Sequence, residues 1–172
     1  MKKKKLFHVS EQADIKEFIP RPSPHINQPV VWAIAEDKLA NYLLPRNCPR
    51  VAYYVGDKTS STDQRRFLSF SSQAIAIEAL WYEQAINTTL YLYEMPAHTF
   101  NLFDSVAGYY VSYAVVFPEA KHIIDTPIQA ILAKNIELRL LPSLWQLHDA
   151  VVNSTLEFSS IRMKNAQPKT TS

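Results

Sequence analysis

The chain has 172 residues, of which 47% are hydrophobic and 12% aromatic, and its formal net charge is +2. This length and composition predict one globular domain and exclude an intrinsically disordered chain. Much of the positive charge lies in residues 2–5, within a basic N-terminal tail of residues 1–5 that we interpret as solubilising. The rest of the sequence carries no strong nucleic-acid signal.

The location of the protein in the cell can be predicted from its lack of a long apolar segment and of a second cysteine. No segment approaches the roughly 18 apolar residues of a transmembrane helix, so we expect no membrane association. The single cysteine, Cys48, cannot form an internal disulfide and fits a reducing cytoplasm. We therefore expect a cytoplasmic protein with one globular domain over residues 6–166 and a C-terminal tail, 167–172, that frays.

Apolar or aromatic runs with the character of strands recur along the chain. They are residues 6–9, 30–34, 51–55, 90–95, 109–117 and 136–141. The run 90–95 is apolar on both alternating faces, which predicts a central strand covered on both sides. Prolines in 20–29 indicate an extended loop, and the polar stretch 57–66 indicates a mobile one.

Three helices are predicted between these strands. The first follows the acidic residues Glu36 and Asp37, whose charges suit a helix N-terminus. The second begins with Thr126 as its cap and Pro127 at its first position, and the third is entered through Pro142. Residues 74–86 are ambiguous, and their pattern favours a strand that runs into a helix.

Two short motifs stand in order near the N-terminus. The segment "LFHVS" (Leu6–Ser10) resembles the first strand of the ADP-ribosyltransferase-like fold, whose His contacts a ribose hydroxyl of NAD. The segment "DKLANY" (37–42) resembles the "SKSANY" segment of poly(ADP-ribose) polymerases, in which a Tyr packs against the nicotinamide. The resemblance covers roughly residues 6–55 and, more loosely, 109–141. The chain also looks like small bacterial proteins that share this outline, from which no substrate follows.

The resemblance implies a fold class and a ligand. The fold is a single α+β domain with a split, mostly antiparallel sheet flanked by a few helices. The implied cofactor is NAD, which would make the chain a possible ADP-ribosyltransferase or a degenerate relative. The alternative is a non-enzymatic module that uses the same fold to bind a nucleotide or a protein.

His8 and Ser10 are the first candidate cofactor-binding residues. They lie on the same face of a strand by two-residue alternation, and both can hydrogen-bond a ribose hydroxyl. The alternative is that His8, between Phe7 and Val9, is a packed residue whose hydrogen bond is satisfied internally.

Four further candidates follow along the chain. By the resemblance, Trp32 and Tyr42 would flank the nicotinamide. A match without gaps, however, puts Val31 where the family has its second stacking Tyr. Trp32 and Tyr42 could equally be core residues. Arg46 and Arg50, in the loop "PRNCPR", could clamp a pyrophosphate, or they could cap helix carbonyls or pair with surface carboxylates. Cys48 between them fits a small buried residue better than a nucleophile.

The third motif of the ADP-ribosyltransferase family is a catalytic Glu at the start of a late strand. In the segment "GYYVSYAVVFP" (108–118) that place is taken by Tyr109 or Tyr110, and we include Tyr110 among the cofactor-binding candidates. A phenol is neutral at pH 7 and cannot stabilise the positive charge that develops on the ribose. Possible substitutes are Glu94, Glu119 and Glu137, so the catalytic residue stays unknown. Relatives such as RNA 2'-phosphotransferases use His and Arg on this fold without that Glu.

Metal chemistry is not predicted. His122 with Asp125 and His148 with Asp149 are the closest approaches to a ligand pair, and neither has the further ligands that a zinc site needs.

Overall fold

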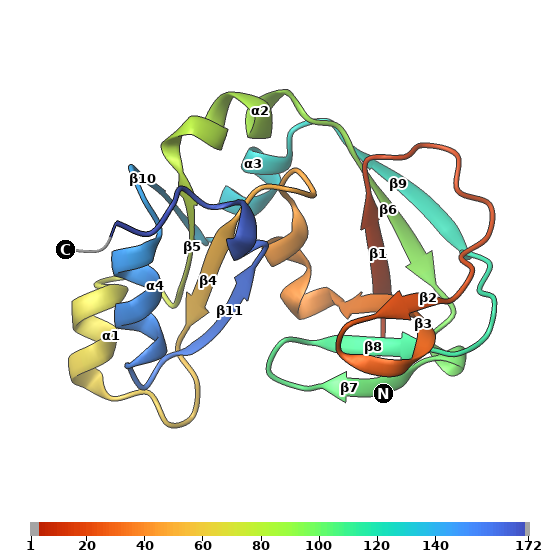
Figure 1. Cartoon of the computed structure of the whole chain (residues 1–172), viewed down its shortest axis with the longest axis horizontal. Coiled ribbons are helices and arrows are strands. Elements are labelled where there is room, and N and C mark those ends of the chain that lie inside the picture. Colours follow the sequence, from red (N-terminus) through yellow and green to blue (C-terminus); the bar gives the residue numbers. More distant parts are fainter. Residues whose placement is uncertain (1–3, 171–172) are drawn as a thin grey trace. The chain divides into compact units, whose positions relative to one another are not determined.

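The computed structural model describes residues 4–170, which fold into two compact units (Figure 1). The first unit contains the described residues up to Leu43 together with Thr89–Asp125, and the second contains Leu44–Thr88 and the described chain from Thr126 onward. The chain therefore enters each unit twice. Each unit has a sheet of its own.

The first unit is built on a seven-stranded sheet in which every named pairing is antiparallel. The strand order is β7-β8-β3-β1-β6-β9, and β2 pairs with β3. Its elements are β1 (Leu6–Ser10), β2 (Arg21–Ser23), β3 (Ile26–Ala35), the 3-10 helix η1 (Glu36–Tyr42), β6 (Leu90–Met95), the 3-10 helix η3 (Ala97–Thr99), β7 (Asn101–Asp104), β8 (Tyr109–Ser112) and β9 (Ala120–Ile124). In Figure 1, β1 and β6 lie side by side, as their five-residue register requires.

One face of this sheet carries a hydrophobic cluster. Side chains alternate between the faces of a strand, so Leu6 of β1, Ala33 and Ala35 of β3 and Tyr110 of β8 point the same way. Phe18, from the segment between β1 and β2, joins them in this cluster. We call the side that bears this cluster the core face of the first sheet, and the other side the opposite face.

Gly108 makes the turn before β8 possible. Its φ is +71°, in the left-handed region that favours glycine, and a Cβ there would lie 2.6 Å from Cγ of Lys38. Its carbonyl accepts a hydrogen bond from the N–H of Ala35 over 2.9 Å, which fixes the end of β3 beside β8.

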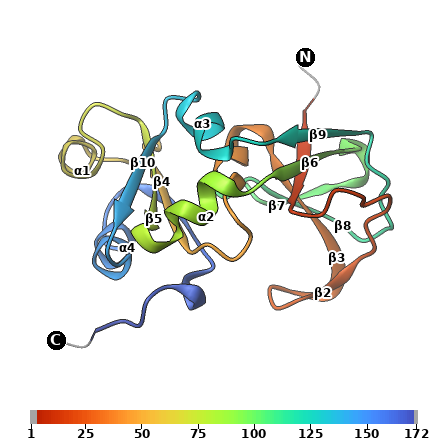
Figure 2. The same ribbon diagram turned by 90° about the horizontal axis from the view of Figure 1, so that it is seen from above.

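The second unit contains a four-stranded sheet of order β10-β5-β4-β11. The pair β5 and β10 is parallel, and the other pairs are antiparallel. Its elements are β4 (Arg50–Tyr54), α1 (Ser61–Phe67), β5 (Gln73–Glu78), the 3-10 helix η2 (Ala79–Trp81), α2 (Tyr82–Asn87), α3 (Pro127–Leu132), β10 (Glu137–Leu141), α4 (Trp145–Val152), β11 (Glu157–Ile161) and the 3-10 helix η4 (Met163–Asn165). Figures 1 and 2 place α1 and α4 on the same side of this sheet, where Phe67 and Val151 pack into one cluster.

The predicted fold class is confirmed. The protein is α+β, its strands form two separate sheets that are mostly antiparallel, and a few short helices flank them. The strands predicted from 6–9, 30–34, 51–55, 90–95 and 136–141 are present, and residues 74–86 form a strand that runs into helices. The extent of the globular part, 6–166, stays a prediction. Within the described residues no helix has the length and apolarity to cross a membrane.

Three local expectations were wrong. The stretch 57–66 contains most of α1, because Ser60 caps that helix by accepting from the N–H of Asp63 over 3.1 Å. The proline-rich loop contains β2, which pairs with the start of β3. The strand predicted over 109–117 ends at Ser112. Within the predicted C-terminal tail, the N–H of Gln167 bonds to Glu78 and Lys169 pairs with Asp149, while residues 171–172 lie outside the described residues.

Candidate ligand-binding site

Two of the three motif segments lie on strands β1 and β8 of the first sheet, and the third lies on η1, the 3-10 helix that directly follows the strand between them, β3. His8 is on β1, Trp32 is on β3 ahead of the helix that contains Tyr42, and Tyr109 and Tyr110 begin β8. Strand β3 pairs with β1 on one side and with β8 on the other. Residues far apart in the sequence thus come together in one half of the sheet.

His8 occupies the point where the β1–β3 ladder ends. The last paired residues are Phe7 and Ile34. One residue further, Nδ1 of His8 lies 2.9 Å from the backbone carbonyl oxygen of Trp32. A carbonyl only accepts, so Nδ1 carries the proton and Nε2 of the neutral ring is an acceptor. The imidazole therefore satisfies a backbone group that the ladder no longer pairs.

His8 and the predicted stacking residues lie on different faces of the sheet. His8 is opposite Tyr93 of β6, on the core face, and its ring lies 4.7 Å from that of Phe18 between centroids. Trp32 is opposite Val111 and alternates with Ala33, so its indole points to the opposite face. The structure therefore brings the backbones of these motifs together without placing their side chains in one site.

Ser10 and Tyr110 share the core face with His8. The hydroxyl of Ser10 accepts a hydrogen bond from the N–H of Gln12 over 3.0 Å, which shapes the turn after β1. Tyr110 is 7% exposed within the cluster, and its hydroxyl bonds to Nζ of Lys4. Its position in the hydrophobic cluster is that of a core residue. The predicted basic tail also contributes here through Lys4, while Lys2 and Lys3 lie outside the described residues.

An aromatic cluster occupies the opposite face. The ring of Tyr109 packs edge to face against Trp32, with centroids 5.6 Å apart, and against Tyr42, at 6.1 Å. The hydroxyls of Tyr42 and Tyr109 are in contact. Phe103 of β7 packs on the other side of Trp32 at 5.1 Å. Phe103 was not predicted, because only its strand pairing brings it beside Trp32.

Arg46 and Arg50 belong to the second unit, where their environments differ. Arg46 is exposed, whereas Arg50 is 1% exposed. The guanidinium of Arg50 donates through Nε and Nη2 to the carbonyl of Cys48, over 2.9 and 2.7 Å, and through Nη2 to that of Pro45 over 2.7 Å. Arg50 thus holds the "PRNCPR" loop through bonds to its backbone carbonyls. These bonds occupy the guanidinium group that was considered as a clamp for a pyrophosphate.

Cys48 is a buried residue of the same loop. Its side chain is fully buried, and burial raises the pKa of its thiol to about 11, so it stays protonated at neutral pH. This confirms the expectation of a small buried residue.

The three candidate carboxylates are also separated. Glu94 of β6 lies opposite Phe7 of β1, with Lys5 at 3.7 Å and His122 at 3.5 Å from its oxygens. Glu119 is exposed, and Glu137 belongs to the second unit, where it pairs with Arg139 at 2.8 Å. Glu94 is therefore the candidate that the sheet places next to the His8 strand, although its pairing with Phe7 puts its side chain on the face opposite to His8. Among residues 4–170, no group of three or more His, Cys, Asp or Glu side chains could hold a metal ion.

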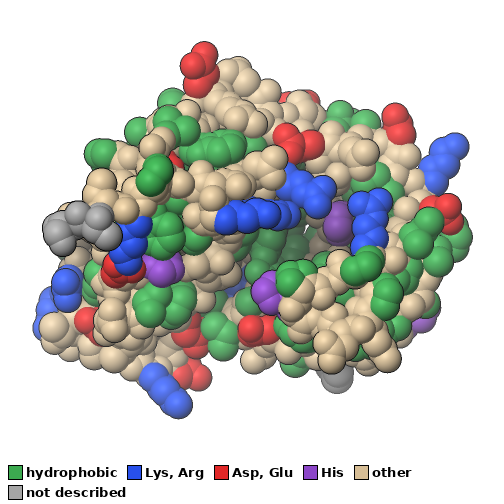
Figure 3. Space-filling model, viewed as in Figure 1, with side chains coloured by type: hydrophobic (Ala, Val, Ile, Leu, Met, Phe, Trp, Pro, Cys, Tyr) green, Lys and Arg blue, Asp and Glu red, His purple; other side chains and the backbone are tan. Residues whose placement is uncertain are grey.

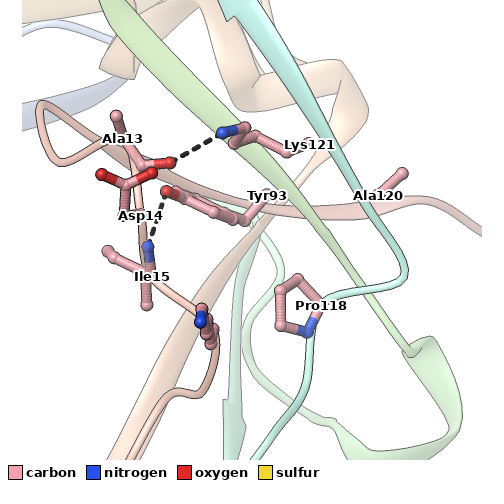
Figure 4. Close-up of a pocket in the computed structure, with 8 residues that line it drawn as sticks. Ala13, Asp14, Ile15, Tyr93, Pro118, Ala120 and Lys121 are labelled. Carbon is pink, nitrogen blue, oxygen red and sulfur yellow. Dashed lines mark hydrogen bonds between the residues drawn. The ribbon is translucent and has the colours of Figure 1, made fainter.

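A hollow adjoins the core face beside the segment that follows β1. Its volume is about 310 Å³, and it is lined by Ala13, Asp14, Ile15, Lys16, Tyr93, Pro118, Ala120 and Lys121. Figure 4 shows Tyr93 and Lys121 reaching from β6 and β9 toward the backbone of Ala13 and Ile15. On the face of the molecule drawn in Figure 3, both signs of charge are interspersed with hydrophobic side chains. The residues around the hollow thus include two lysines, one aspartate, one tyrosine and an apolar wall.

These features define an α+β protein with two sheets, a His anchored at a strand end and a small hollow on the same face. Residues 7–166 match the model of a family of unknown function, DUF6886, and the chain belongs to that family. The chain matches no curated protein and no solved structure.

Proposed function

We propose that this protein binds NAD or an ADP-ribosyl group at the strand that carries His8, and that it turns NAD over slowly or not at all. The observation that carries the proposal is the adjacency of β1, β3 and β8. The resemblance to ADP-ribosyltransferases depends on three motifs that are distant in the sequence, and a sheet that separated their strands would speak against it.

The geometry of His8 supports the binding role. The contact between Nδ1 and the Trp32 carbonyl selects one tautomer and orients the ring before any ligand arrives. An oriented imidazole that accepts through Nε2 suits the hydroxyl of a ribose. Because the ring is already positioned, little conformational entropy is lost on binding.

Slow turnover is proposed because no carboxylate takes the place of the family's Glu. By the resemblance, Tyr109 or Tyr110 takes that place, and the phenol of Tyr109 is engaged with Tyr42. The same contact favours the second candidate function, a non-enzymatic module, because Tyr109 fills space between Trp32 and Tyr42 in which a nicotinamide would stack.

Calorimetric titration of the wild-type protein with NAD and with ADP-ribose tests the proposal. The His8→Ala variant should bind more weakly by roughly 0.5 to 1.5 kcal/mol, the net value of one hydrogen bond. His25→Ala is the matched control, because His25 is exposed in the turn between β2 and β3. Unchanged affinity in a folded His8→Ala variant removes His8 from the site, and no binding by the wild type favours the non-enzymatic module without a nucleotide.

A further inference from the structure

The segment of residues 11–19 covers part of the core face of the first sheet. We call it the strap. It joins β1 to β2, and its one ladder contact in the described chain is a bridge in which Phe18 and Val116 exchange both backbone hydrogen bonds, over 2.8 and 3.0 Å. Most of its side chains, such as Glu11 and Lys16, are exposed. The strap is thus attached near its end and lies over the sheet elsewhere.

Phe18 is the part of the strap that reaches His8. Its ring centroid lies 4.7 Å from that of His8 and 5.3 Å from that of Tyr93, and Phe18 is 8% exposed. The aromatic ring therefore covers one side of the imidazole. A ligand that approaches His8 from this side meets Phe18 first.

Few polar contacts hold the middle of the strap. The hydroxyl of Tyr93 donates to the carbonyl of Gln12 over 2.6 Å and accepts from the N–H of Ile15 over 3.1 Å. Nζ of Lys121 donates to the carbonyl of Ala13 over 2.8 Å. Hollows of about 310 and 560 Å³ adjoin residues 12–17. Residues 12–17 therefore have few buried contacts apart from Ile15, and such a segment belongs to the low-stability part of a fold, which opens most readily. Phe18 is held more firmly, so full opening also breaks its bridge to Val116.

The charge of the strap opposes an anionic ligand in the closed form. Glu11, Asp14 and Glu17 carry three negative charges against the single positive charge of Lys16. This net negative charge disfavours the approach of a pyrophosphate to the strap, although the exposure of the three residues screens the effect. Displacement of the strap would leave Lys121, which now bonds to Ala13, able to meet such a ligand.

We infer that the strap is a lid over His8, with Phe18 as the plug, and that a phosphate-bearing ligand reaches the imidazole after the strap lifts. The identity of that ligand rests on the proposed function, whereas the lid itself does not. An experiment can therefore reject the lid without rejecting the proposed function, and can reject the proposed function without rejecting the lid.

A reversible lock tests the lid directly. Phe18 and Val116 form a hydrogen-bonded pair. If the antiparallel geometry continues for one more residue, Ile19 and Val115 form the neighbouring non-hydrogen-bonded pair, a position where Cα atoms are typically about 4.5 Å apart and a disulfide can form. Both side chains are exposed, at 57% and 45%. The variant is Ile19→Cys with Val115→Cys. The native Cys48 is buried with a raised thiol pKa, so it does not compete for oxidation.

The readout is the rate at which diethylpyrocarbonate acylates His8, resolved by mass spectrometry, with exposed His25 as the internal reference. We expect oxidation of the double-cysteine variant to slow the reaction of His8 about tenfold, which corresponds to an opening equilibrium shifted by about 1.4 kcal/mol. Reduction should restore the rate in the same sample. Equal rates at His8 in the oxidised and reduced forms overturn the lid.

A second variant loosens the strap without removing its plug. Tyr93→Phe keeps the ring and deletes the hydroxyl that holds Gln12 and Ile15, so His8 should react about tenfold faster than in the wild type. Tyr91→Phe is the matched control, because Tyr91 lies on the same strand and face and no hydrogen bond of its hydroxyl is found among the described residues. Equal acceleration in both variants contradicts the assigned role of Tyr93.

Titration with ADP-ribose separates the lid from the proposed function. Weaker binding by the oxidised form than by the reduced form supports both. If His8 responds to the lock and no form binds ADP-ribose, the lid stands and the proposed ligand is wrong. If ADP-ribose binds equally to both forms and the rate at His8 does not change, the lid is wrong and the proposed function stands.

Discussion

The backbone N–H of Gln167 donates to both carboxylate oxygens of Glu78, over 3.0 Å to Oε1 and 3.1 Å to Oε2. Oε1 also accepts from the N–H of Leu144, at the start of α4, over 3.4 Å. Glu78 is 1% exposed and ends strand β5. A buried carboxylate thus joins a central strand, a helix start and the chain near its C-terminus within the second unit.

Replacing Glu78 by Gln should destabilise the second unit. The amide keeps one acceptor oxygen but turns an N–H₂ group toward backbone donors, and hydrogen bonds to a charged group contribute about 1.5 to 3 kcal/mol. We expect the free energy of unfolding in urea to fall by roughly that amount. Glu83→Gln, on the exposed side of α2, is the control and should change little. A Glu78→Gln variant as stable as the wild type would show that the carboxylate charge is not needed.

Tyr53 and Tyr93 should respond in opposite ways to loss of the hydroxyl. The Tyr53 hydroxyl is buried with no hydrogen-bond partner among the described residues, and burial raises its pKa to about 12. Tyr53→Phe should therefore leave the stability unchanged or raise it by about 1 kcal/mol, since an unsatisfied buried group is removed. Tyr93→Phe loses two bonds and should lower it by about 1 to 3 kcal/mol. Urea unfolding that shows a larger loss for Tyr53→Phe would reveal a partner outside the described residues.

The second unit should become less stable as the pH is lowered, because the Asp63 carboxylate becomes protonated. The hydroxyl and the backbone N–H of Thr155 donate to this carboxylate and hold its pKa below the usual value of 3.8. A depressed folded-state pKa stabilises the fold above the unfolded value, and this contribution disappears as pH falls through the folded-state pKa. Urea unfolding between about pH 5 and pH 2 should show the decline, and Asp63→Asn should reduce its slope. An unchanged slope in that variant would assign the decline to other carboxylates.

Release of nicotinamide from NAD should be slow or absent. If the proposed resemblance to ADP-ribosyltransferases holds, Tyr109 or Tyr110 takes the place of the catalytic Glu of that family, and a lost electrostatic contact to a developing charge typically costs about 100- to 1000-fold in rate. The assay uses the wild-type protein with and without a mixture of protein and RNA acceptors. Robust release would show that another carboxylate acts, and substitution of Glu94, Glu119 and Glu137 by Gln, one at a time, would identify it. Glu94 comes first, because it lies opposite Phe7 beside the His8 strand.

Local sequence signals were sufficient for most of the elements. The apolar runs at β1, β3, β5 and β6 and the Thr126-Pro127 start of α3 depend on residues next to one another, so they were predicted correctly. The α1 helix was missed because its surface is polar and its support comes from Thr155, which is distant in the sequence. Strands β7, β9 and β11 are edge strands, of which β7 and β9 are mostly exposed and β11 is half-buried, and their side chains carry little of the alternation that identifies a strand.

The sequence by itself determined the α+β class and most of the strands, because residue type and spacing set the period of each element. The nucleotide contacts that it indicates stay predictions. Only the tertiary structure decided where those side chains point. Pairing between strands put His8 on the core face under Phe18 and Trp32 on the opposite face. Chain packing also buried Arg50 against its own loop, although the exposed Arg46 lies in the same motif. Burial and strand register arise from contacts between distant residues, which local patterns do not encode.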